Sequence, residues 1–119
     1  MKKLLIVLSL LLFTFSSYSA DVCSIYNAFD KNALAAEQAY GGWQTITGYV
    51  SEVGYDLFGN LQLTLGCENS DFNWSSVVIS MNDSEKSKMM YLQPGQRVSV
   101  KAKFSGKIIF PFYENGQIL

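Results

Sequence analysis

The sequence predicts a small, mainly β domain: a five-stranded Greek-key barrel of the OB-fold class, preceded by one helix. Three observations predict it. Apolar residues recur at steps of three and four over residues 24–40. Segments that alternate apolar and polar residues follow, separated by glycine- and asparagine-rich turns. A short helical stretch, residues 83–92, comes after the third strand, which gives the OB-fold order β-β-β-α-β-β behind the first helix.

The first 20 residues have the pattern of a secretory signal peptide. Lys2 and Lys3 precede an apolar stretch, residues 4–15, and small residues dominate 16–20. The apolar stretch is shorter than the roughly 20 residues that a membrane-spanning helix needs. We therefore expect a cleaved signal and export to the periplasm.

The signal peptide leaves one exported domain, residues 21–119, and the cut is expected after Ser19 or after Ala20. A lipid anchor on Cys23 would need a small, uncharged triplet before that cysteine. Asp21 lies in this triplet, so we expect no membrane anchor.

The N-terminal helix is predicted over 24–40, with Ser24 as N-cap and Gly41-Gly42 as its stop. Five strands follow, over 43–53, 61–67, 74–81, 97–104 and from 107 to 112.

Three features of these strands carry further expectations. Gly48, inside the first strand, indicates a bend or bulge, and Ser105-Gly106 indicates a tight hairpin. Pro111 indicates an edge or interrupted strand. A cystatin-like fold is the structural alternative, but it needs no helix at 83–92.

The charge balance argues against nucleic acid as a partner. Without Lys2 and Lys3, seven basic residues remain against ten acidic residues, a net charge near −3. Nucleic-acid binders normally carry a basic excess, because phosphate neutralisation supplies most of their affinity. The chain also lacks histidine, the commonest general base and transition-metal ligand. We expect no catalytic residues, no metal site and no cofactor.

Cys23 and Cys67 are the only cysteines. Two cysteines in an exported chain most simply form one disulfide. A reactive or metal-binding thiol pair is the alternative, and it is disfavoured because no histidine and no CxxC spacing accompany them.

Two stretches resemble the tRNA_anti-like family of exported bacterial OB-fold proteins. The first contains an aromatic residue, an Asn, an Ala–acid pair, a Tyr-x-Gly turn and an apolar-x-Gly-x-Val strand. It comprises Ala28, Phe29, Asn32, Ala36, Glu37, Tyr40, Gly42 and 46–50. The second is the strand 95–102, which begins Gly-Gln-Arg-Val. This sequence departs from the family's pattern at Trp43, Ala102 and Gly116. The resemblance implies an exported protein or lipoprotein and does not imply tRNA binding.

Two groups of residues are candidates for ligand contact. A basic stripe consists of Arg97, Lys101, Lys103 and Lys107. It would suit an anion, but a solvated strand face is the favoured interpretation, because four cations are ordinary on an acidic protein. Aromatic residues on the first strand and in loops could stack on a ligand, or could serve packing; they are Tyr49, Tyr55, Phe58, Phe72 and Trp74.

These observations favour a non-catalytic binding module, a monomer or weak dimer. Its ligand would be a small molecule, a glycan or an envelope protein, and no physiological nucleic acid is expected. The alternative is an envelope immunity or inhibitor protein that neutralises a toxin or hydrolase through a protein–protein contact.

Overall fold

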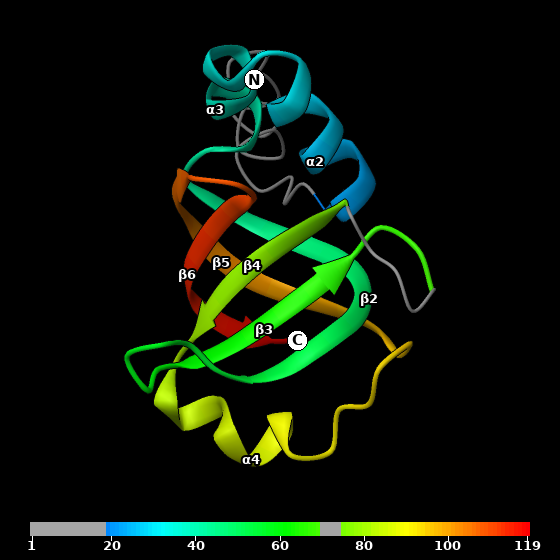
Figure 1. Cartoon of the computed structure of the whole chain (residues 1–119), viewed down its shortest axis with the longest axis vertical. Helices are drawn as coiled ribbons and strands as arrows, with labels where there is room; N and C mark the ends of the chain where they lie inside the picture. Colours follow the sequence, from blue (N-terminus) through cyan, green and yellow to red (C-terminus); the bar gives the residue numbers. More distant parts are fainter. Residues whose placement is uncertain (1–18, 70–74) are drawn as a thin grey trace, which may run out of the picture.

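Five strands with alternating apolar residues close into a barrel (Figure 1). The computed structural model describes residues 19–69 and 75–119. The barrel strands are β2 (Trp43–Tyr55), β3 (Leu61–Gly66), β4 (Ser76–Met81), β5 (Arg97–Lys107) and β6 (Pro111–Ile118). Their order is β2-β3-β4-β6-β5, and β5 pairs back to β2. This is the order of an OB-fold, which confirms the predicted fold class and excludes the cystatin-like alternative.

The alternation in the sequence decides which side chains enter the core. Ile46 and Val50 on β2, Leu63 and Leu65 on β3, and Val100 on β5 are all buried. Apart from Gly66, their neighbours in the strands point outward and are half-buried or exposed. The inner faces of the sheet therefore supply most of the core.

The N-terminal helix is broken in two at Asn32. Helix α2 (Val22–Lys31) ends there and α3 (Ala33–Tyr40) begins, because Asn32 has an extended backbone and its Oδ1 accepts a hydrogen bond from the N–H of Ala35 at 3.2 Å. The predicted single helix 24–40 therefore has the right place but the wrong continuity. Its start is also earlier: Asp21, not Ser24, is the N-cap, and its carboxylate accepts from the N–H groups of Cys23 and Ser24.

Helix α2 covers one end of the barrel with an aromatic stack. Phe29 packs on Phe104 with ring centroids 5.1 Å apart, and Phe104 meets Tyr113 edge-on at 5.4 Å. The Tyr113 hydroxyl donates to the carbonyl of Tyr40 at 2.6 Å. Burial raises the pKa of Tyr113, which keeps this donor protonated.

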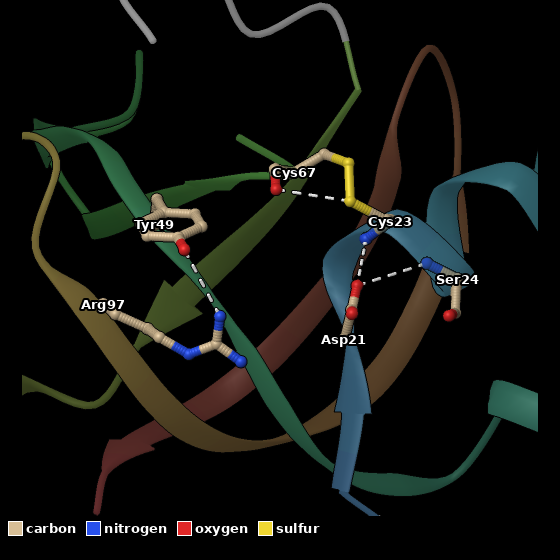
Figure 2. The surroundings of a disulfide bond; sticks show 6 residues. All are labelled: Asp21, Cys23, Ser24, Tyr49, Cys67 and Arg97. Carbon is tan, nitrogen blue, oxygen red and sulfur yellow. Dashed lines mark hydrogen bonds between the residues drawn. A yellow bond between two sulfur atoms is a disulfide. The ribbon is translucent and has the colours of Figure 1, made fainter. Parts of the chain in front are cut away.

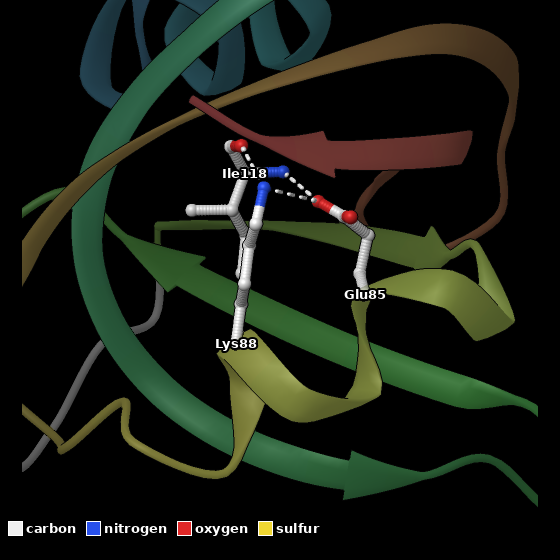
Figure 3. Close-up of polar contacts among 3 residues, drawn as sticks. All are labelled: Glu85, Lys88 and Ile118. Atoms are coloured by element: carbon white, nitrogen blue, oxygen red, sulfur yellow. Dashed lines mark hydrogen bonds and ion pairs between the residues drawn. The ribbon is translucent and has the colours of Figure 1, made fainter.

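A short helical segment covers the opposite end. It consists of the 3₁₀ turn η1 (Asp83–Glu85) and the one-turn helix α4 (Lys86–Met89), shorter than the predicted 83–92. Met89 enters the core. The buried carboxylate of Glu85 accepts the N–H of Ile118 at 2.5 Å and lies 3.9 Å from the ammonium of Lys88 (Figure 3). The Glu85 carboxylate thus links this helical segment to β6, whereas aromatic packing links α2 to the barrel at the other end.

The predicted disulfide is confirmed. Cys23, in the first turn of α2, is bonded to Cys67, which directly follows β3 (Figure 2). Their Cα atoms are 4.6 Å apart. The bond therefore fastens the helix to the barrel wall.

Strand β1 (Ser19–Asp21) is an element that the sequence did not predict. It pairs in parallel with Thr45–Thr47 of β2, and Ala20 is buried there. Ser19 and Ala20 belong to the predicted signal peptide, and residues 1–18 lie outside the described residues.

Three local predictions need correction. The bulge in β2 lies between Val50 and Glu52, not at Gly48. Gly48 is required instead because a Cβ there would come 2.5 Å from a methyl group of Val22 on α2. The last hairpin turns after Lys107, not at Ser105-Gly106. Pro111 begins β6, an inner strand paired on both sides, which a first-position proline permits.

Candidate functional site

The residues proposed from the sequence fall on two separate surfaces. Tyr55 ends β2 where that strand pairs with β3, and Phe58 follows in the 56–60 loop. Tyr49 lies where β2 pairs with β5, directly across from Arg97. We call the first surface the loop face, made of Tyr55, Leu57, Phe58, Gln62 and Phe112, and the second the strand face, made of Trp43, Thr47, Tyr49, Arg97, Ser99 and Lys101.

A network around Asp56 holds the loop face in shape. The Asp56 carboxylate accepts the backbone N–H of Phe58 at 2.8 Å and that of Asn60 at 2.9 Å. The N–H of Asn60, followed by that of Phe58, lowers the pKa of Asp56 below its ordinary value. Gly59 adopts a positive φ of 82°, which closes the turn. Polar contacts therefore build this loop, and its apolar side chains take no part in it.

The apolar side chains of the loop point into solvent beside a hollow. Leu57 is 100% exposed and Phe58 is 89% exposed. A hollow of about 510 Å³ lies between the loop and the barrel wall, within the size range of small-ligand sites. Its walls are formed by the loop face and Asp56. The amide of Gln62 and the hydroxyl of Tyr55 add polar groups to this lining.

A smaller hollow adjoins the first through Tyr55. It has a volume of about 140 Å³ and lies against the end of the barrel that α4 covers. Met89 and Met90 line it, and the ammonium of Lys86 lies 5.9 Å from the Tyr55 ring centroid. Methionine side chains adapt to ligands of different shape, so apolar contact surface continues from the loop to α4.

The strand face has different chemistry. Cations on β5 lie over rings on β2: Arg97 over Tyr49 and Lys101 over Trp43, each 5.6 Å from the ring centroid. Hydroxyl groups separate these pairs. Lys103, also predicted as a ligand contact, is exposed further along β5 and has Glu114 of β6 as its cross-strand neighbour.

The structure thus brings together some of the predicted residues and separates others. Tyr55 and Phe58 share one face; Tyr49, Arg97 and Lys101 share the other. Phe72 and Trp74 lie outside the described residues. Sequence reasoning missed Leu57 and Phe112. Leu57 could have been found as an apolar residue inside a polar turn, whereas Phe112 needed the pairing of β6 beside β4.

The described residues contain no group of three or more potential metal ligands among histidine, cysteine, aspartate and glutamate. Within the same two ranges, no helix combines the length and apolar character needed to cross a membrane.

Comparison with known proteins identifies a family and a structural relative. The family model tRNA_anti-like matches residues 4–115. A crystal structure of a Klebsiella pneumoniae lipoprotein, whose description proposes nucleic-acid binding, superposes with a TM-score of 0.63 at 13% identity, covering 87% of this chain and 92% of that one. A DUF3299 family protein from Pseudomonas aeruginosa gives a TM-score of 0.43 at 10% identity over 87% of this chain and 97% of that one. No curated protein matches the sequence.

Proposed function

Because the chain belongs to the tRNA_anti-like family and folds as a closed OB barrel, we propose that it is an exported, non-catalytic binding module whose ligand contacts the loop face. The observation that carries this proposal is the exposure of Leu57 and Phe58 beside the 510 Å³ hollow. In OB-folds, the loops joining the first strand to the second and the fourth to the fifth flank the ligand-binding face. The 56–60 loop is the first of these.

Export is supported by two features of the chain and by one structural relative. Residues 1–20 carry the basic, apolar and small-residue pattern of a secretory signal. The disulfide between Cys23 and Cys67 is of a kind that persists in oxidising compartments such as the periplasm. The Klebsiella pneumoniae relative is described as a lipoprotein, which is also an exported class. Together they favour a periplasmic location.

The chemistry of the loop face supports binding without catalysis. The one carboxylate that lines the hollow beside it, that of Asp56, accepts backbone N–H groups and its pKa is lowered, which makes it a weak general base. Histidine is absent from the chain. The remaining contacts, Tyr55, Phe58 and Phe112, supply apolar surface for affinity.

Cations are sparse on the loop face, which argues against nucleic acid there. Lys86 lies over the Tyr55 ring, while Arg97 and Lys101 lie on the strand face. Nucleic-acid affinity rests largely on neutralised phosphates. We therefore propose an apolar or aromatic group on a small ligand, a glycan or a protein as the contact.

An immunity or inhibitor role is the second candidate, and exposed isoleucines favour it. The turn between β5 and β6 presents Ile108 and Ile109, 92% and 73% exposed. This is the second of the two loops that flank the ligand face of an OB-fold. A protein partner that engaged both loops would bury about 1,000 Å² or more in total.

Site-specific photo-crosslinking in the periplasm tests the proposal. A photoreactive phenylalanine replaces Phe58, and the matched control carries it at Leu34, an equally apolar position that is 79% exposed on α3. We expect a covalent adduct at position 58 and none at position 34.

The adduct's mass then separates the two candidates. A small mass increase indicates a ligand or glycan fragment, and a protein-sized increase indicates an envelope partner. Equal labelling at both positions, or none at position 58, would refute the loop face as the site.

A further inference from the structure

The strand face carries cations that lack carboxylate partners. Among the described residues, neither Arg97 nor Lys101 makes an ion pair, although both are exposed. Arg97 donates one long hydrogen bond, 3.4 Å, to the Tyr49 hydroxyl, which leaves most of its five N–H donors free. The side chain of Lys101 lies over Trp43, and its three ammonium donors remain available. Ring contact fixes both cations without neutralising them.

Hydroxyl groups fill the space between the two cation–ring pairs. Thr47 Oγ1 lies 2.8 Å from Ser99 Oγ across the β2–β5 pairing. The face therefore presents a ring, a pair of hydroxyl groups and a second ring. Hydroxyls both donate and accept hydrogen bonds, which suits a ligand that is itself rich in hydroxyl groups.

The spacing of these groups selects an extended ligand. Trp43 and Tyr49 are six residues apart on one strand, about 20 Å at roughly 3.3 Å per residue. Arg97 and Lys101 are four residues apart, about 13 Å on the same measure. A small anion would reach one of the cations, whereas a chain lying along the strands would reach both.

The low density of positive charge decides which kind of chain fits. A nucleic-acid strand carries a phosphate about every 3.4 Å in a duplex, so about four phosphates would face two cations. Lys103, which lies across from Trp43 on β2, adds a third cation at one end, but the Glu114 carboxylate lies across from it on β6 and offsets that charge. The net charge near −3 of the predicted mature chain repels the unpaired phosphates. A chain with one acidic group per two sugars matches the two cations far better.

We propose that the strand face binds an acidic polysaccharide with widely spaced carboxylates. Arg97 and Lys101 bind carboxylates, Trp43 and Tyr49 pack on sugar rings, and the Thr47–Ser99 pair hydrogen-bonds sugar hydroxyls. Half of the Trp43 surface remains exposed for this contact. This goes beyond the function proposed for the loop face and adds a second ligand surface.

A titration series of probes with increasing charge density tests this. The purified exported protein is titrated with neutral cello-oligosaccharides, with hyaluronan oligosaccharides, which carry one carboxylate per disaccharide, and with a double-stranded oligonucleotide of equal length. We expect the hyaluronan fragments to bind most tightly, with chemical-shift changes at Thr47 and Ser99, and with affinity that falls as salt is raised.

Variants of the charged residues provide the matched comparison. Arg97→Gln with Lys101→Gln should weaken hyaluronan binding about 10-fold, since exposed charge-assisted contacts contribute less than buried ones. Trp43→Ala should weaken it with both charges intact. Lys86→Gln removes a cation that lies over a ring on the other surface, 5.9 Å from Tyr55, and should change nothing.

Several outcomes would overturn the proposal: no hyaluronan binding at low salt, tighter binding of the oligonucleotide, or an equal loss with Lys86→Gln. Thermal unfolding of each variant shows whether it remains folded. The position-58 adduct should persist in the Arg97→Gln/Lys101→Gln variant, which separates a failure here from a failure at the loop face.

Discussion

Phe29 and Phe58 have the same side chain in opposite settings. Phe29 is 1% exposed between α2 and the barrel, in the stack with Phe104, whereas Phe58 is 89% exposed in the 56–60 loop. Ile25 and Leu57 repeat the contrast, at 0% and 100% exposed. Apolar residues on α2 thus contribute to folding, and those of the loop do not.

The loop keeps its shape by polar contacts, and this difference explains the exposure. Asp56 accepts N–H groups from both Phe58 and Asn60. Neither Leu57 nor Phe58 is among the buried core residues. Their apolar surface is therefore available to a ligand without cost to the barrel.

Truncation of the buried ring should have the largest effect. Phe29→Ala removes the partner of Phe104 and leaves a cavity, which we expect to lower the free energy of unfolding by about 3–5 kcal/mol. Urea denaturation of the variant and the parent protein measures this change. A loss below about 1 kcal/mol would show that α2 does not stabilise the barrel through packing.

Loss of the disulfide should rank next. The bond joins residues that are 44 positions apart, and Cys23→Ser with Cys67→Ser should destabilise the fold by about 2–4 kcal/mol, chiefly through the unfolded chain. Denaturant unfolding of oxidised parent and double variant gives the value. Neither cysteine lines the hollow beside the loop face, so the photo-crosslinked adduct at position 58 should still form in the double variant. Loss of that adduct would show that the loop face depends on the disulfide.

The opposite end of the barrel depends on one carboxylate. Glu85→Ala leaves the N–H of Ile118 without its acceptor, and we expect a loss of about 1–3 kcal/mol. Glu85→Gln retains a carbonyl oxygen and should lose less. Thermal unfolding measures both variants. Equal destabilisation would mean that the charge of Glu85, rather than its hydrogen bond to Ile118, stabilises this end of the barrel.

Acid should loosen the loop before it unfolds the barrel. The pKa of Asp56 is lowered in the folded state, so its stabilising contribution is present above its ordinary value of 3.8 and is lost as pH falls through the lower folded value. A carboxyl-detected NMR titration should give a pKa below 3.8, together with shifts of the Phe58 and Asn60 amides. A titration at or above 3.8 would contradict the network that shapes the loop.

Period-two alternation was enough to predict the five strands, and the helical stretch after the third strand was needed to predict the barrel. The cysteine count was enough to predict the disulfide. The break at Asn32 was not predictable from propensity, because the flanking residues Lys31 and Ala33 both favour a helix and only the capping geometry decides. Strand β1 depends on pairing with residues more than 20 positions away, which no local pattern reports.

The candidate site was harder to predict than the fold. Tyr49 was expected on the first strand and Tyr55 in the loop that follows it, both as candidate ligand contacts. In the structure both residues lie on β2, and the bulge between Val50 and Glu52 puts them on different surfaces. The aromatic residues named as one candidate group therefore belong to two surfaces.

The most direct test of the loop face combines two readings on one pair of variants. For Phe58→Ser and Leu34→Ser, the free energy of unfolding should change by no more than about 0.5 kcal/mol, since both side chains are exposed. A photoreactive residue at Leu57 should then label its ligand in the Leu34→Ser background and lose most of that label in the Phe58→Ser background. Destabilisation by Phe58→Ser alone, or labelling that is the same in both backgrounds, would contradict a ligand surface at this loop.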